Sequence, residues 1–559
     1  MKRLLLSTAA IVVIAAAAVG GGSVFADSDH DRDHGFDHRT ATPIKHLVII
    51  FNENRSFDHY FATYPHAADP PGEIPFRASP ETPTVNNLAS AHLLTNNPNL
   101  NPANGSGGTN PFRLDRTQAD TADQNHAYTP EQEAYDDGKA DLFPKFTGNG
   151  TPGGAGAFGT TGQVLGYFDG NTVTAIWNYA QYFAMDDNAY TDTYGPSTPG
   201  ALEVVSGQTN GAVNVVGSPS DIPDGVGGLT LNGDTDPAAD ICSSATRQVR
   251  MTSKNIGDLL NAADVSWGGF MGGFNLLATN ANGTTGCARS TFSSVIGANI
   301  TDYVPHHMWF QYFTSTENPT HARPSSVFAI GHSTVPGSNG ADPANHEYDI
   351  QDFFAAVKAG NFPSVSFVKM PAYRDAHPGN SDPLDEQQGV VDLVNFLESQ
   401  PDWANTAVIL TYDDSDGWYD HAYATPTAAS YNATADQVNG PGQCGTGATS
   451  QPQPDGLAGK PVNGRCGPGT RIPFVVISPF AKRNYVSHER ISQASVVRFI
   501  EDNWLHGERL GGGSFDASAG SIMDMFDFNQ FGFPFGNTYA LFLDPTAGTV
   551  LSPVPPGYH

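Results

Sequence analysis

The chain has 559 residues, of which 39% are apolar, and its formal net charge is −30. This length is sufficient for one large domain or several smaller ones, and the acidity argues against nucleic acid as a partner. So acidic a protein repels anions, and an anionic substrate would need local positive charge from a metal ion, an arginine or a protonated histidine. The 60 glycines and 41 prolines indicate many ordered loops on a scaffold.

The N-terminus has the pattern of a signal peptide. Lys2 and Arg3 precede the apolar run 4–19, and residues 24–26 match a small-x-small cleavage site. A membrane anchor is the alternative, but the apolar run is short and is followed by glycines. We therefore expect a secreted or periplasmic protein without stable membrane insertion. The predicted parts are a signal peptide, a disordered leader rich in His and Asp, and one domain with loop insertions, at 1–26, 27–42 and 43–559.

Four cysteines in an exported chain suggest disulfide bonds. The pairing of sequence neighbours, Cys242 with Cys287 and Cys444 with Cys466, would restrain two loops rich in small and polar residues. Other pairings remain open. No Cys-x-x-Cys motif occurs, so a zinc site built from thiolates is not expected.

Short apolar strands and helices alternate along the chain. After a strand at 44–51 and a long loop-rich stretch, we expect helices within 129–141 and at 171–184, short apolar pieces at 201–206 and 212–216, helices at 255–262, 348–359, 385–399 and 493–504, and strands at 265–270, 364–369, 406–411 and 472–478. This alternation predicts an α/β fold with long inserted loops, in which helices cover both faces of a mostly parallel sheet. Ligand groups gather at the carboxyl ends of the strands of such sheets.

Two of the predicted strands end in oxygen-bearing side chains. Glu53 and Asn54 follow the strand at 44–51, and Asp413 and Asp414 follow the strand at 406–411. If the two strands are parallel neighbours, these four side chains share one crevice. Three unpaired carboxylates cannot share a small site. A divalent cation resolves the conflict, and oxygen ligands favour Ca²⁺, Mg²⁺ or Mn²⁺.

Each of these acidic segments has a simpler interpretation when it is considered alone. Adjacent acids after a strand are often turn or cap residues, and the Glu-Asn-Arg sequence could form a surface ion pair. The segment "DDSDGWYDH" partly matches an EF-hand loop, but Tyr412 stands two residues before Asp414 where that loop needs an aspartate. The combination of polar groups at two strand ends favours the metal site.

Ser197 is the candidate nucleophile. It lies between Pro196 and the pair Thr198-Pro199, and prolines on both sides fix the backbone around its hydroxyl. A rigid serine suits nucleophilic catalysis, and a metal ion could lower its effective pKa. An ordinary proline-rich turn is the alternative.

A serine esterase of the α/β-hydrolase type is a rival interpretation. Ser197, Asp413 and His421 follow one another in the chain order of that triad. The nucleophile elbow, however, needs a glycine two residues after the serine, and this chain has Pro199 there. The rival also leaves the remaining acids and Asn54 without a role.

Three histidines in polar, loop-like stretches are further candidates: His126, His307 and His377. A single histidine in a loop is usually just exposed to solvent. Three histidines near an anion-binding site could instead hold its oxygens and donate a proton to a leaving group.

Together these residues form motifs that resemble a known family. "ENRSFDHYF", "GPSTP", "HP" at 377–378 and "TYDDSDGWYDH", in this order, are similar to the bacterial phosphoesterase family of secreted acid phosphatases and non-specific phospholipases C. The resemblance extends from Ile44 to about Trp504. It implies an alkaline-phosphatase-like α/β core and makes 43–559 a single phosphoesterase catalytic domain.

The resemblance also implies roles for individual residues. One divalent metal ion would bind Glu53, Asn54, Ser197, Asp413 and Asp414, and Ser197 would be the nucleophile. His126, His377 and His307 would contact phosphate or act in acid–base catalysis, with His306 as the alternative to His307. Relatives usually carry Asn where this chain has Gly200, so whatever that Asn supports is in question. In the first motif, Ser56 is expected to cap a helix, and Arg55 to anchor the turn or neutralise a nearby acid.

The function that follows is an exported, metal-dependent phosphoric ester hydrolase with a phosphoserine intermediate. A phosphomonoesterase of the acid phosphatase type is favoured, because phospholipases C of this family often have Thr at the nucleophile and additional C-terminal domains. A phospholipase C that hydrolyses phosphatidylcholine-type diesters is the alternative, so the substrate is a small phosphate ester or a phospholipid headgroup. A secreted Ca²⁺-stabilised binding protein would explain the acidity but not Ser197. The metal's identity and the oligomeric state stay open.

Overall fold

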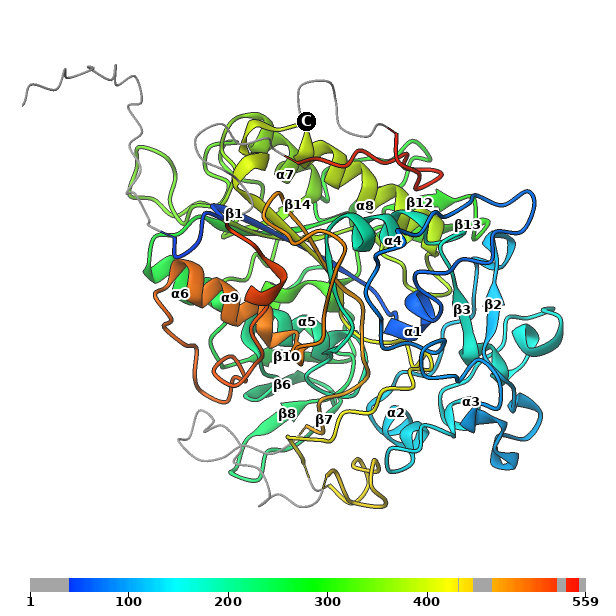
Figure 1. Ribbon diagram of the computed structural model, residues 1–559. Helices are drawn as coiled ribbons and strands as arrows, with labels where there is room; N and C mark the ends of the chain where they lie inside the picture. Colours follow the sequence, from blue (N-terminus) through cyan, green and yellow to red (C-terminus); the bar gives the residue numbers. More distant parts are fainter. Residues whose placement is uncertain (1–39, 431, 446–464, 530–538, 552–559) are drawn as a thin grey trace, which may run out of the picture. The chain divides into compact units, whose positions relative to one another are not determined.

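An eight-stranded sheet forms the centre of the computed structural model (Figure 1). The structure describes residues 40–430, 432–445, 465–529 and 539–551, and the predicted signal peptide lies outside these ranges. The strands, in their order across the sheet, are β14 Glu347–Asp349, β11 Trp267–Met271, β15 Val365–Lys369, β1 His46–Asn52, β16 Thr406–Tyr412, β17 Phe474–Ile477, β4 Ala184–Asp186 and β18 Tyr485–Ser487.

Most neighbours in this sheet run parallel. β1 pairs in parallel with both β15 and β16, and β11 pairs in parallel with β14 and β15. β17 is antiparallel to both of its neighbours, β16 and β4. Residues 47–51 of β1 are completely buried, as expected for a strand covered on both faces. The predicted mostly parallel sheet is confirmed.

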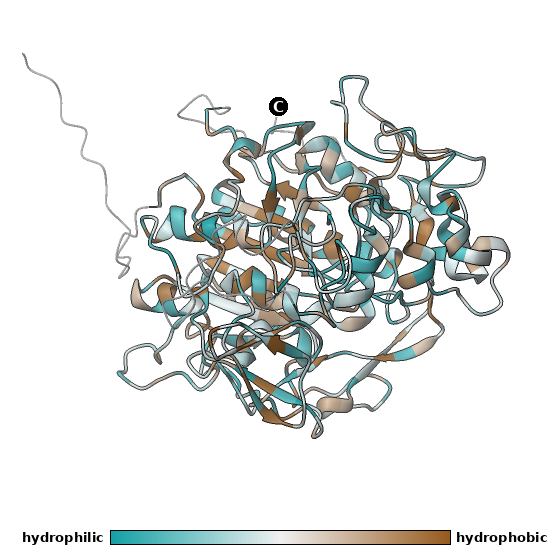
Figure 2. Cartoon of the chain, turned by 90° about the horizontal axis from the view of Figure 1, so that it is seen from below, coloured by the Kyte–Doolittle hydropathy of each residue, from teal (hydrophilic) through white to brown (hydrophobic). Residues whose placement is uncertain are grey.

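Helices cover both faces of the sheet (Figure 1). On one face lie α4 Thr174–Tyr182, α7 Ile350–Lys358 and α8 Pro383–Glu398. On the other lie α5 Ser197–Ser206, α6 Ile256–Ala262 and α9 Ala494–Trp504. Figure 2 shows the hydrophobic residues gathered along the central strands. The α/β class is confirmed, and every helix within the described ranges is too short or too polar to cross a membrane.

Most predicted elements are present, with differences at their ends. The predicted helix at 348–359 begins later, because Tyr348 belongs to β14 and Asp349 caps α7 through the Gln351 N–H. The helix expected within 129–141 is α2, Tyr128–Tyr135, which stops at Asp136 in the left-handed conformation. The apolar piece 201–206 is the second half of α5.

A second, smaller hydrophobic core lies beneath the loops that follow α1, Phe57–Phe61. It contains residues of α2 and α3, Phe143–Phe146, together with Cys444 and Cys466. These cysteines form one disulfide, and Cys242 and Cys287 form the other, so the predicted pairing is confirmed.

Small sheets decorate the loops around the central sheet. One is three-stranded and contains β6 Ala212–Val216, β10 Gln248–Met251 and β9 Asp236–Pro237. The two-stranded ones pair β2 Phe112–Leu114 with β3 Gly166–Phe168, β5 Ala189–Tyr190 with β19 Ile491–Ser492, β7 Asp221–Pro223 with β8 Leu229–Leu231, and β12 Ser290–Ser293 with β13 Ala298–Thr301. These pieces form the long inserted loops that the glycine and proline content predicted.

Candidate active site

The candidate site is built where three neighbouring strands end. β1 lies between β15 and β16, and the register pairs Asn52 with Tyr412. The residues that follow, Glu53 and Asn54 on one strand and Asp413 and Asp414 on the other, therefore leave the sheet side by side. All four are at most 1% exposed. The structure thus brings together the four side chains that the sequence placed in one crevice.

The turn after β1 lets consecutive residues face the same site. Successive side chains of a strand point to opposite faces, and a straight continuation would separate Glu53 from Asn54. Asn54 instead has a φ of 57°, in the left-handed region that asparagine tolerates better than most residues. Its backbone N–H donates to Asp413 Oδ1 at 2.9 Å, which connects the two strand ends.

The next turn begins the helix that the sequence predicted. Ser56 caps α1 by accepting a hydrogen bond from the His59 N–H at 3.2 Å. The Arg55 guanidinium contacts His59 and the carbonyl oxygen of Ala376. Arg55 therefore anchors the turn, as one of the two expected roles requires.

Ser197 is the first residue of α5 and lies 1% exposed among the strand ends. Its hydroxyl donates to Glu53 Oε2 at 2.9 Å. The same oxygen is 3.4 Å from Asn54 Oδ1 and 3.3 Å from Asp414 Oδ2. The Ser197 oxygen thus contacts oxygens of three of the other four residues predicted to share a metal ion.

Gly200 explains how the helix comes so close to the strand end. A Cβ atom at this position would overlap the backbone of Asp413. The glycine therefore allows the first turn of α5 to rest directly on β16. Gly200 is, in this chain, part of how Ser197 reaches the carboxylates.

The side-chain amide of Asn54 lies among the oxygens of Glu53 and Asp413. Its oxygen faces acceptors only, and if the amide were turned over, its nitrogen would donate to Glu53 Oε2 at 2.6 Å and to Asp413 Oδ1 at 3.2 Å. The turned amide is satisfied within the protein alone, whereas a cation among these oxygens would favour the opposite orientation.

The pKa values of Asp413 and Asp414 also favour a cation at this site. Burial, and then the charge of Glu53, raises the pKa of Asp413 to about 8. Burial, and then Asp413, raises the pKa of Asp414 well above its ordinary value. Without a bound cation, it is unfavourable for these two buried carboxyl groups to be ionised at the same time. The donor set of carboxylate, amide and hydroxyl oxygens suits a hard divalent cation such as Ca²⁺, Mg²⁺ or Mn²⁺.

Two other groups near the strand ends have spacing suitable for a metal ion. In each, ligand atoms of three side chains lie within 4.8 Å of one another. One group is Glu53, His307 and Asp375, and the other is Asp123, His126 and His377. The set of Glu53, Asp413 and Asp414 is not among the groups that meet this criterion in the described ranges. The residues could hold a metal, and its number and position are not fixed by the geometry.

Lys369 is a site residue that the sequence analysis missed. It is the last residue of β15, is 1% exposed, and forms an ion pair with the Glu53 carboxylate. Burial lowers its pKa, but Glu53, Asp413 and Asp375 raise it by more, so the pKa stands above the ordinary value. Lys369 therefore remains charged and offsets one of the buried negative charges. Its place at the end of an apolar strand is a weak local signal, which points to the site only once the strand order is known.

His307, rather than His306, reaches the strand ends. His307 Nδ1 lies 3.2 Å from Glu53 Oε1 and 3.8 Å from Asp375 Oδ2. The neighbouring ring of His306 turns to Asp236, at 3.4 Å. Burial, and then the charge of Lys369, lowers the pKa of His307 well below its usual value.

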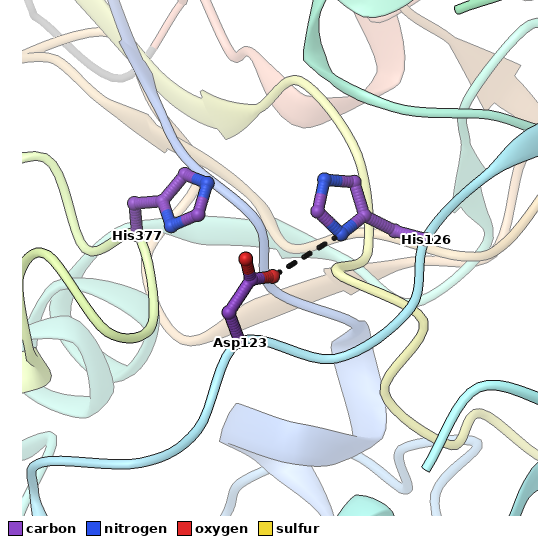
Figure 3. A group of neighbouring side chains, drawn as sticks. All are labelled: Asp123, His126 and His377. Atoms are coloured by element: carbon purple, nitrogen blue, oxygen red, sulfur yellow. Dashed lines mark ion pairs between the residues drawn. The ribbon is translucent and has the colours of Figure 1, made fainter. Parts of the chain in front are cut away.

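His126 and His377 complete a row of three imidazoles. The His377 ring centre is 6.0 Å from that of His126 and 6.3 Å from that of His307. In Figure 3, Asp123 and His126 point toward each other, and His377 lies opposite them. His126 Nδ1 is 3.5 Å from Asp123 and 3.2 Å from the buried Asp416, a partner that sequence reasoning also missed.

The three histidines differ in protonation. Burial lowers the pKa of His126, but the carboxylates of Asp414, Asp416 and Asp123 raise it by more, and it stands well above the ordinary value. Burial lowers the pKa of His377, as it does for His307. The surroundings therefore favour the charged form of His126 and the neutral forms of His307 and His377.

The arrangement required by the serine-esterase rival is not present. His421 Nδ1 pairs with Asp58 Oδ2 at 2.6 Å, and its Nε2 faces Asn86 at 3.1 Å. Within the described residues, no hydrogen bond or ion pair joins His421 to Ser197 or Asp413.

Comparison with known proteins agrees with the motifs. The family model described as "Phosphoesterase family" matches residues 44–505. The chain belongs to this family, and the resemblance seen in the sequence is confirmed.

Two relatives are phospholipases C by name. The non-hemolytic phospholipase C of Pseudomonas aeruginosa is 23% identical over 469 residues, which are 84% of this chain and 55% of that protein. Phospholipase C B of Mycobacterium tuberculosis is 25% identical over 473 residues, 82% of this chain and 73% of that one. The chain thus spans about half the length of the first relative.

A solved structure from work on glycosaminoglycan metabolism by Bacteroides thetaiotaomicron aligns with 68% of this chain and 81% of its own, at 12% identity and a TM-score of 0.28. A TM-score this low does not by itself establish a common fold.

Proposed function

We propose that this chain is an exported, metal-dependent phosphoric ester hydrolase that acts on phosphomonoesters through a phosphoserine intermediate. The observation that carries the proposal is the Ser197 hydroxyl, held at the start of α5 within 2.9–3.4 Å of Glu53, Asn54 and Asp414 oxygens. A hydroxyl buried among carboxylate and amide oxygens at the start of a helix is placed for nucleophilic attack. The two disulfides suit an oxidising compartment outside the cytoplasm.

The proposed ligands of one divalent cation are Glu53, Asn54, Ser197, Asp413 and Asp414. When bound, the cation would lower the effective pKa of the serine hydroxyl and stabilise charge on the phosphoryl oxygens. Ser197 Oγ attacks phosphorus in line with the leaving group, and its proton passes to Glu53 Oε2, which already accepts it at 2.9 Å. Water then attacks the phosphoserine, His126, deprotonated in the first step, takes the proton of the water, and Ser197 Oγ leaves with the proton that Glu53 returns.

The histidine row divides the remaining work. His126, whose pKa is raised, donates its proton to the departing alcohol. The pKa values of His307 and His377 are lowered, and the Nδ1–H of His377 donates to the Pro378 carbonyl oxygen at 2.8 Å. The Nε2 of such a ring donates to a phosphoryl oxygen only once the ring takes up a proton, which the negative charge of a bound phosphate would favour. Lys369 keeps one oxygen of Glu53 engaged and leaves the other facing Ser197.

A phospholipase C is the second candidate, because the relatives carry that name. The two functions differ in whether the phosphate carries one ester bond or two. The test is hydrolysis of p-nitrophenyl phosphate against p-nitrophenyl phosphorylcholine by the mature protein and by Ser197→Ala, each with and without EDTA.

We expect preference for the monoester, lost in the variant and in chelator. Preference for the choline diester with the same losses would transfer the proposal to phospholipase C. Activity that survives EDTA would contradict metal dependence. Metal binding without any activity would favour the Ca²⁺-stabilised binding protein.

A further inference from the structure

A pocket of about 490 Å³ adjoins the candidate site. Its volume lies in the range of about 300–1,000 Å³ that small-molecule sites occupy. His126 and Pro196, the residue before the nucleophile, are part of its wall. So is Asp234, whose Oδ1 accepts from both the backbone N–H and the hydroxyl of Thr198, each at 3.0 Å. The pocket thus begins beside the proposed acid and the proposed nucleophile.

The far wall of the pocket carries polar groups that the protein leaves available. Ser220, Asn232 and Arg247 line it. In the part of the chain that the structure describes, none of these three side chains makes a hydrogen bond or an ion pair. The backbone of Ser220 and Asn232 is nevertheless fixed, since the Asn232 N–H donates to the Ser220 carbonyl oxygen at 3.0 Å. A hydroxyl and a carboxamide on these joined loop segments, and the guanidinium of Arg247 directly before β10, are therefore presented to the pocket.

We infer that this pocket binds the alcohol moiety of the substrate and that this alcohol is polyhydroxylated, as in a sugar or polyol phosphate. The inference rests on the proposed function. Hydroxyl groups both donate and accept, so they match the mixture of Ser220, Asn232, Arg247 and the half-exposed Asp123 carboxylate. An acyl or alkyl moiety would gain no hydrogen bond from these groups. A second anionic group would meet two carboxylates, Asp123 and Asp234, against the one guanidinium of Arg247.

The test compares two monoesters that share the phosphate and differ in the alcohol, glucose 6-phosphate and butyl phosphate. The metal-loaded wild type is expected to have the higher kcat/KM with glucose 6-phosphate. Asn232→Ala and Arg247→Ala should each raise KM for glucose 6-phosphate about threefold to tenfold, the effect of one lost hydrogen bond, and leave butyl phosphate unchanged. Arg250→Ala is the matched control, because Arg250 faces Glu317 at 3.7 Å and is not in the pocket wall.

Equal kcat/KM for the two esters, with activity lost in Ser197→Ala, would overturn the subsite and keep the proposed function. KM changes of the same size for both esters would also overturn it. Hydrolysis of neither ester by the wild type would overturn the proposed function and the subsite with it. Melting temperatures confirm that each variant is folded, so that a loss of activity is not a loss of protein.

Discussion

Two buried acidic clusters lie in this molecule, and they solve the same electrostatic problem in different ways. In the first, Asp58 and Asp420 surround Arg471, whose side chain is completely buried. In the second, at the strand ends, Lys369 pairs with Glu53 rather than with Asp413 or Asp414, and the positive charge that acts most on Asp414 is that of the His126 imidazole. In the first cluster, Asp58, Asp420 and His421 are spaced as a metal site would be, and beside the second one set with this spacing is Glu53, His307 and Asp375.

The difference appears in which carboxyl groups stay ionised. Burial raises the pKa of Asp58, but His421 and Arg471 lower it by more, so it stands below the ordinary value. Burial raises the pKa of Asp420 only to about 6, against about 8 for Asp413. The arginine cluster is close to neutral by itself, whereas the strand-end cluster has excess negative charge. Spacing alone therefore does not identify a metal site. The two clusters differ in whether a fixed cation of the protein balances the buried carboxylates.

The largest expected effect comes from removing one charge of the strand-end cluster. Asp414→Asn should lower kcat/KM with p-nitrophenyl phosphate by about 1,000-fold, since a metal contributes several kcal/mol to the transition state. The same variant should raise the melting temperature of the metal-free protein, because like-charge repulsion is relieved. Steady-state kinetics and calorimetry in EDTA measure the two effects.

Asp420→Asn is the matched control for this change. It should destabilise the protein and leave kcat/KM per folded molecule unaltered, because Asp420 loses a buried arginine partner. If both variants changed stability in the same direction, the distinction between the clusters would be wrong.

The second prediction removes the arginine. Arg471 donates to Asp420 and Asp58 and, at 2.7 Å each, to the carbonyl oxygens of Asn86 and Asp187. Arg471→Met should lower the free energy of unfolding by about 3–5 kcal/mol, because it leaves buried charges unpaired. Urea denaturation gives this value.

Arg498 provides the comparison for that measurement. Its side chain is 30% exposed and lies 3.7 Å from Asp502 one helical turn away. Arg498→Met should cost about 1 kcal/mol or less. Equal losses in the two variants would mean that the buried arginine cluster has no special structural role.

The ligand-bearing strand ends could be predicted, and their fixed cation could not. Glu53 and Asp413 each follow a continuous apolar run, so the change in polarity marks where the strand stops. Lys369 also ends such a run, but a lysine there is usually solvated. Lys369 reaches the site because β15 lies next to β1. The pattern of apolar residues predicts that a segment is a strand, but it does not predict which strands are its neighbours.

The sequence analysis missed that a helix begins at Ser197, because of the prolines on either side. Pro196 and Pro199 predict a rigid turn, and proline is also tolerated in the first turn of a helix. Local sequence does not choose between the two. The choice is made by Gly200 resting on the backbone of Asp413, a contact between segments more than two hundred residues apart. Tertiary contacts also decide between His306 and His307. The two residues are adjacent, so the sequence alone does not show which of them reaches the strand ends.

The third prediction removes the lysine that pairs with Glu53. Lys369→Met should lower the free energy of unfolding of the metal-free protein by about 3 kcal/mol, because Glu53 loses its buried partner. With one fixed cation fewer, a divalent ion should be bound more tightly. A tenfold gain in affinity would add about 1.4 kcal/mol to the metal-dependent stabilisation. Thermal shifts with and without Ca²⁺, Mg²⁺ or Mn²⁺ measure it, and an unchanged shift would separate Lys369 from the metal site.

The smallest effect concerns His421, in the arginine cluster. Burial lowers its pKa, but Asp58 raises it by more, so the folded-state pKa is above the ordinary value. Its stabilising charge is therefore fully present below the unfolded pKa near 6.5 and is lost as the pH rises through the folded value. We expect His421→Gln to remove a small part of the stability, on the order of 1 kcal/mol or less, at pH 6 but not at pH 9. Because the difference is taken between two pH values in metal-free buffer, the other titrating groups cancel between variant and wild type. A loss of equal size at both pH values would show that His421 acts through packing rather than through its charge.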